Sequence, residues 1–142
     1  MVSDLDRLEA IAGELLAEFD VKAAPVPIED ILQDPKDGMW DQVDVTQLSG
    51  SFLSLTERFS PRMSIARLLA RHLATCPWGK DRGLFDLLRQ GDNLARFARI
   101  LIIPKMLLEP VSESERNPAT LGLKFEAPED DIRIRLDEVF GN

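Results

Sequence analysis

Apolar residues recur at steps of three and four along most of this chain, the spacing that places side chains on one face of an α-helix. The first such stretch follows Ser3, a residue type that commonly caps a helix N-terminus, and its apolar positions are Leu5, Leu8, Ile11, Ala12, Leu15, Leu16 and Phe19. Prolines mark many of the points where the pattern stops, because proline cannot continue a helix. The pattern predicts helices over 4–19, 28–32, 60–76, 84–103, 119–125 and 129–140, with a break at Gly91 left open.

The segment between residues 39 and 55 changes to a period of two. Val43 and Val45 alternate with polar residues, Leu53 and Leu55 alternate with their neighbours, and a Ser-Gly pair separates the two runs. Alternation of this kind is typical of short strands with one buried face. The sequence therefore predicts a mainly helical fold of the α+β class, with a small sheet formed in this segment.

Length and composition favour one globular domain. The chain has 142 residues, 44% of them hydrophobic, so a single core is expected. No apolar run approaches the roughly 20 residues that a membrane-spanning helix needs, and the first residues are acidic and amphipathic, unlike a basic leader. We therefore expect a cytoplasmic protein with no membrane partner.

Charge is unevenly distributed along the chain, whose net charge is −8. Residues 58–105 include ten basic residues and three acidic ones, whereas both flanking parts are strongly acidic. Two interpretations stay open. The acidic flanks fold back on the basic middle or surface charges interleave, or else a basic cleft receives an acidic segment of a partner.

Four short motifs occur in order along the chain. They are APVPIEDI at 24–31, RMSIA at 62–66, RFARILIIP at 96–104, and LKFEAP followed by IRIRL at 123–136. In type, order and spacing they resemble motifs of the ImmA/IrrE family of bacterial and phage zinc metallopeptidases, whose domain is called IrrE N-terminal-like.

The resemblance implies one IrrE N-terminal-like domain over residues 1–142. Its zincin-like core would span 1–110, with a two- to three-stranded sheet packed on the former active-site helix. A linker over 111–118 and a C-terminal helical pair over 119–142 would follow.

The catalytic motif of the family is degenerate at the position where the resemblance places it. In the family, the RMSIA-like lead is followed by His-Glu-x-x-His, in which the histidines bind zinc and the glutamate is the general base. Here the three positions are Arg67, Leu68 and Arg71, and the later glutamate ligand corresponds to Gly91. Arginine has no lone pair to offer a metal. We therefore expect no catalytic residue, no metal and no cofactor, and interpret the chain as a pseudoenzyme.

His72 and Cys76 are the only histidine and the only cysteine of the chain. Their spacing of four places them on one helix face, yet two ligands leave the shell of a zinc ion half empty. A single cysteine also excludes a disulfide within the chain. We expect both side chains, like Leu68, to pack on or beside the apolar stripe of the helix over 60–76.

By the resemblance, such a fold would bind a peptide that it cannot cut, laid along an edge strand at about 50–56. Family members act on helix-turn-helix repressors, so the implied partner is a protein or peptide, such as a transcription regulator of that type. The expected partner contacts are Arg67, Arg71, His72, Phe52, Arg96 and Arg99. Two alternatives remain: a self-associating structural domain, and a peptidase with unrecognised chemistry. The oligomeric state is left open.

Direct binding of nucleic acid is disfavoured, although the last two helices have a helix-turn-helix look. Residues 126–142 include six acids and two arginines, a balance that repels phosphate. Any DNA contact would have to come from the basic middle of the chain. The candidate residues there are Arg62, Arg67, Arg71, Arg96 and Arg99.

Overall fold

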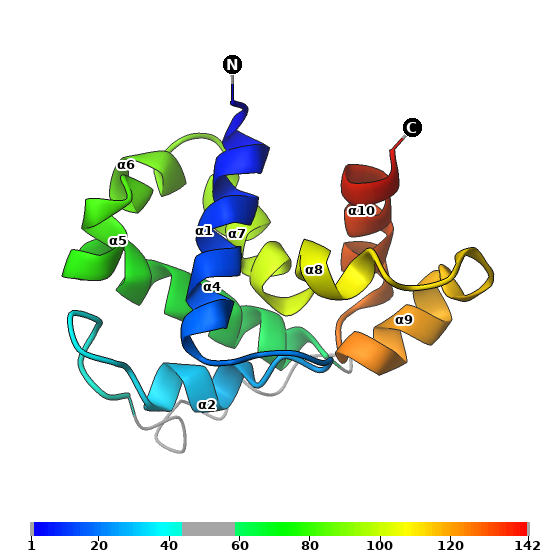
Figure 1. Cartoon of the computed structure of the whole chain (residues 1–142), viewed down its shortest axis with the longest axis horizontal. Coiled ribbons are helices and arrows are strands. Elements are labelled where there is room, and N and C mark those ends of the chain that lie inside the picture. The colour runs from blue at the N-terminus through cyan, green and yellow to red at the C-terminus, as the bar shows by residue number, and fades with distance from the viewer. Residues whose placement is uncertain (1, 44–58, 142) are drawn as a thin grey trace.

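The computed structural model describes residues 2–43 and 59–141, and the regular structure in these ranges is helical (Figure 1). The elements are α1 (Asp4–Glu18), α2 (Ile28–Gln33), α4 (Ser60–Thr75), α5 (Pro77–Asp81), α6 (Leu84–Leu88), α7 (Asn93–Ile102), α8 (Lys105–Leu108), the 3-10 helix η2 (Glu113–Glu115), α9 (Pro118–Phe125) and α10 (Glu129–Phe140). None of the helices in the described ranges is long and apolar enough to cross a membrane.

The predicted α+β fold with a sheet packed on a helix is wrong, because the described residues contain helices and no strand. Residues 39–43, where the first strand was expected to begin, have irregular structure. In this stretch the side chain of Trp40 is buried, and its indole Nε1 donates a 2.8 Å hydrogen bond to the carbonyl of Leu32 at the end of α2. The remainder of both predicted strands, 44–55, lies outside the described residues.

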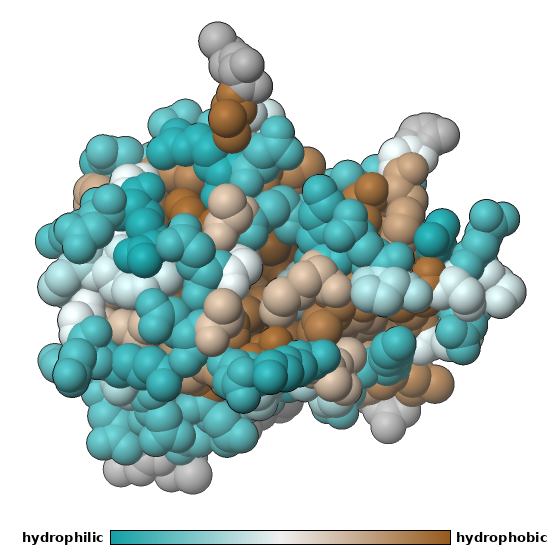
Figure 2. Space-filling view, in the orientation of Figure 1, coloured by the Kyte–Doolittle hydropathy of each residue, from teal (hydrophilic) through white to brown (hydrophobic). Residues whose placement is uncertain are grey.

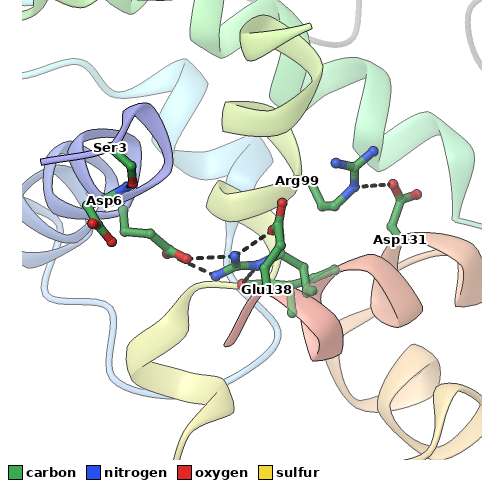
Figure 3. Close-up of polar contacts among 8 residues, drawn as sticks. Ser3, Asp6, Arg99, Asp131 and Glu138 are labelled. Atoms are coloured by element: carbon green, nitrogen blue, oxygen red, sulfur yellow. Dashed lines mark hydrogen bonds and ion pairs between the residues drawn. The ribbon is translucent and has the colours of Figure 1, made fainter. Parts of the chain in front are cut away.

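Local signals in the sequence set most helix boundaries. Ser3 caps α1 as predicted, since its Oγ accepts a 3.1 Å hydrogen bond from the backbone N–H of Asp6 (Figure 3). The predicted helix over 84–103 is two helices, α6 and α7, and the turn between them includes Gly91 at a φ of +52°.

The stretch 77–83, which lies between two predicted helices, includes a helix that was not predicted, because Pro77 begins the short helix α5. Trp78 is buried, and a Cβ on Gly79 would clash with the carbonyl of Leu73 at the end of α4. Only glycine allows the two helix ends to approach this closely.

Helix α4 lies at the centre of the core and contacts α2, α5, α6 and α7. Its Leu69 and Leu73 are fully buried, as are Phe97 and Leu101 of α7, and α1 packs on α7 in turn. The exposed edge of α4 therefore bears the residues that the core does not use.

A buried arginine connects both ends of the chain to this core. Arg135 on α10 has no exposed surface, and its Nη atoms donate hydrogen bonds of 2.7 and 2.9 Å to the two carboxylate oxygens of Glu9 on α1. Its Nε donates to the carbonyl of Ile103 at 2.8 Å, and Nη1 also reaches Glu138 at 2.9 Å (Figure 3). Each of the three guanidinium nitrogens thus donates, and together they join α1, the end of α7 and α10.

We expect Arg135→Met to lower the free energy of unfolding by about 3–5 kcal/mol, because it leaves Glu9 and the Ile103 carbonyl without their donor. Arg133→Met on the same helix is the matched control, since its two ion pairs are on the surface, and should change stability by no more than about 0.5 kcal/mol. Urea denaturation followed by circular dichroism measures both. Equal losses in the two variants would contradict a stabilising role for the buried arginine.

Candidate functional site

Helix α4 places the degenerate catalytic positions at the boundary between core and solvent. Leu68 is partly buried and packs against the core. Arg67 is partly buried as well, and its Nη2 donates a 3.1 Å hydrogen bond to Oγ of Ser64, one turn earlier. Arg71 is exposed. The two arginines therefore lie one turn apart along one side of the helix, while the leucine between them belongs to the packed side.

Gly91 lies in the exposed turn before α7, where the sequence interpretation expected a helical position. A Cβ at Gly91 would meet nothing within 4 Å, and its positive φ disfavours any other residue. The next residue, Asp92, is the N-cap of α7 and lies 3.9 Å from Arg96. A side chain at position 91, where the third ligand was expected, would therefore begin in open space.

His72 and Cys76 share a shallow hollow of about 320 Å³ with Met39, Trp40 and Asp41. The thiol of Cys76 is buried and donates to the carbonyl of Leu73 at 3.2 Å, so it is directed at its own helix. Within residues 2–43 and 59–141, no group of three His, Cys, Asp or Glu side chains is arranged to hold a metal ion.

Three arginines of the basic middle pair with carboxylates of the acidic flanks. Arg62 donates to Glu29 at 2.9 Å and to the carbonyls of Val26 and Glu126 at 2.8 and 3.0 Å. Arg99 on α7 donates to Asp131 on α10 at 2.8 Å (Figure 3). Arg82 lies 3.2 Å from Glu14 on α1. For these three residues, the interpretation that the acidic flanks fold back on the basic middle is confirmed.

Other basic residues of the same stretch are not neutralised in this way. In the part of the chain that the structure describes, no ion pair to a carboxylate is formed by Arg67, Arg71, Lys80, Arg89 or Lys105. Arg96 has only the long contact to Asp92. Charge available to a partner therefore remains on the exposed side of α4 and on α6.

Arg71 and Arg89 meet at one hollow of about 300 Å³ between α4, α6 and the start of α7. The hollow is lined by Arg71, Ala74, Thr75, Phe85, Leu88, Arg89 and Leu94, and is called the Arg71/Arg89 hollow below. Its lining surface is almost wholly apolar, although two of the residues that contribute to it are arginines. Such a surface can take up an apolar side chain and pair with anions beside it.

A larger hollow of about 380 Å³ lies between α1, α7 and α8, where Figure 2 shows apolar side chains reaching the surface. Ala10, Gly13 and Met106 contribute to its lining, and so do charged residues of both signs. Glu9 is one of them, and its carboxylate already accepts two hydrogen bonds from Arg135. This hollow has no excess of one charge and gives a weaker basis for recognition.

The structure divides the predicted partner contacts among different places. Arg71 lines the Arg71/Arg89 hollow, His72 faces the hollow beside Trp40, and Arg99 is used inside the fold. Arg67 and Arg96 are half-buried on α4 and α7, and Phe52 lies outside the described residues. Sequence reasoning missed Phe85 and Arg89. Their spacing of four on a helix was a visible signal, yet only the packing of α6 beside α4 brings them to Arg71.

Comparisons of this chain with models of protein families, with curated proteins and with solved structures found no match. The assignment to the ImmA/IrrE family therefore rests on the four motifs alone and stays a prediction.

The division of the arginines predicts two classes of variant. Arg62→Gln and Arg99→Gln should each lower the free energy of unfolding by about 1–3 kcal/mol, because carboxylates and carbonyls lose a charged donor. Arg71→Gln and Arg89→Gln should stay within about 0.5 kcal/mol of the parent. Thermal and urea denaturation of the four variants test this, and a large loss at Arg71 or Arg89 would show that these residues support the fold.

Proposed function

We propose that this protein is a pseudoenzyme that binds another protein, a transcription regulator with a helix-turn-helix domain, and does not cleave it. The observation that carries the proposal is the exposed Arg71 beside an apolar hollow on α4, at a position where the resemblance would require a zinc ligand. A permanently charged side chain at the edge of an apolar surface suits recognition of a partner and cannot bind a cation.

The chemistry of the other motif positions supports the same proposal. Arg67 offers only N–H donors, one of which is given to Ser64, and Leu68 packs against the core. A general base at position 68 would need a carboxylate facing a bound water, and leucine has no proton to accept or give. These positions therefore supply contact surface and no acid–base chemistry.

The nature of the partner follows from the resemblance and from charge. Peptidases of the ImmA/IrrE family act on helix-turn-helix repressors, and a relative without the zinc motif would retain binding of such a regulator without cutting it. The unpaired arginines on α4 and α6 favour an acidic part of that regulator over its DNA-binding surface, which is basic in most such domains. The place of action would be the cytoplasm, where transcription regulators of bacteria and phages work.

The proposal predicts capture of an intact regulator. The tagged protein, incubated with lysate of its native host at low and moderate salt, should retain a helix-turn-helix protein identifiable by mass spectrometry. Purified regulator should then bind equally with and without a chelator. Arg67→Ala/Arg71→Ala should weaken this binding at least tenfold, while the matched control Lys124→Ala/Arg133→Ala on α9 and α10 should not.

Two results would contradict the proposal. Stoichiometric zinc in the purified protein, with cleavage of the regulator that a chelator stops, would establish a peptidase with unrecognised chemistry. Failure to retain any regulator, combined with salt-sensitive self-association, would favour the structural alternative.

A further inference from the structure

The Arg71/Arg89 hollow is an apolar surface to which two arginines contribute, Arg71 from α4 and Arg89 from the end of α6. Ala74 and Leu88 form buried parts of the floor, and Leu94 at the start of α7 is partly exposed above the core. Phe85 forms a wall and keeps 39% of its surface exposed. An aromatic ring left this accessible beside buried aliphatic groups can pack against an incoming side chain at little cost in ordering.

The two arginines at the hollow differ from Arg62, Arg99 and Arg135, which are paired with carboxylates. Arg89 lies over the ring of Phe85 at 5.5 Å from the centroid, a weak cation–π contact that leaves its N–H groups to other acceptors. Arg71 approaches from α4. Neither has a carboxylate partner among the described residues, and no acid lines the hollow there. The hollow is therefore a local positive site on a chain whose net charge is −8.

The size of the hollow limits its occupant. Pockets for small-molecule ligands and cofactors usually enclose about 300–1,000 Å³. With about 300 Å³ in an open hollow, this site is at the lower end and suits one anchoring side chain of a protein segment better than a whole cofactor.

We propose that the Arg71/Arg89 hollow binds an acidic amphipathic helix of the partner protein. One large apolar side chain of that helix enters beside Phe85 and Leu94, and carboxylates one turn before and after it pair with Arg71 and Arg89. This inference rests on the proposed function, because it specifies which kind of segment of the regulator is held. The negative charge of the whole chain repels an acidic partner at long range, so the attraction acts only within about a Debye length, ~8 Å at physiological salt.

A second copy of this chain is the competing occupant. Helix α10 exposes 40% of Ile134, and Asp130 and Asp137 lie one turn before and after it on the same exposed face. This face has the same chemistry as the segment proposed for the partner. The test must therefore separate binding of a foreign helix from self-association.

The test uses three fluorescein-labelled, helix-forming peptides and the full-length protein. The first peptide presents one leucine with glutamates one turn before and after it, the second replaces the glutamates by glutamine, and the third replaces the leucine by alanine. Fluorescence anisotropy should show that the first binds at least tenfold more tightly than either of the others. Its affinity should also fall as salt is raised, because the charge pairs are at the rim.

Variants assign this binding to the hollow. Arg71→Gln/Arg89→Gln and Phe85→Ala should each weaken the first peptide at least tenfold, while the control Lys80→Gln/Lys124→Gln removes the same charge from exposed sites outside the hollow and should change affinity less than twofold. Equal weakening by the control, or equal affinity for the first two peptides, would overturn the proposal. A concentration-dependent dimer that is lost in both Arg71→Gln/Arg89→Gln and Ile134→Ser, with no peptide bound, would overturn it in favour of a second copy.

The outcomes separate this inference from the proposed function. If a regulator binds the Arg71→Gln/Arg89→Gln variant as tightly as the parent, the hollow is not the binding site, and the proposed binding function still stands. If the acidic peptide binds selectively but no regulator is retained from the host, the hollow is supported as a binding site for acidic helices, and the proposed partner is refuted.

Discussion

The fold of the described residues depends on one buried guanidinium group. Arg135 joins α10 to Glu9 on α1 and to the carbonyl that ends α7, so two segments far apart in sequence are held against the same point of the core. Removing one partner of a buried ion pair is costly, because it leaves an uncompensated charge in the core. Glu138 on the same helix also faces the guanidinium, so two carboxylates on different helices lie at one buried charge.

The same residue type serves two different purposes in this protein. Arg62, Arg99 and Arg135 are held by carboxylates and carbonyls contributed by the acidic parts of the chain. Those contacts attach α2, α9 and α10 to the helical core and use up acidic groups that would otherwise repel one another. Arg71 and Arg89 have no such partners among the described residues, and both line the same hollow. This difference, rather than the total charge, makes the hollow the best candidate for recognition.

The packing of α4 gives different surroundings to the positions that the resemblance identifies as catalytic. Leu68 is on the side that meets the core, so a carboxylate there would lose hydration, whereas Arg71 is in solvent beside Phe85 and Leu94. Helix α4, which forms one side of the Arg71/Arg89 hollow, is thus the helix that the resemblance identifies as catalytic. A surface of this kind can bind a partner with the side chains that are present, without a metal.

The sequence by itself determined the local structure that depends on neighbours along the chain. Helical periodicity and the Ser3 cap predicted most helices, because these signals act over a few residues, whereas the break at Gly91 was left open. Tertiary structure decided the environment of Trp40, whose buried indole bonds to α2, a contact that no local pattern predicted. It also decided which arginines are structural and which are free, because pairing across 32 to 126 positions in sequence depends on how the helices pack and not on any local pattern.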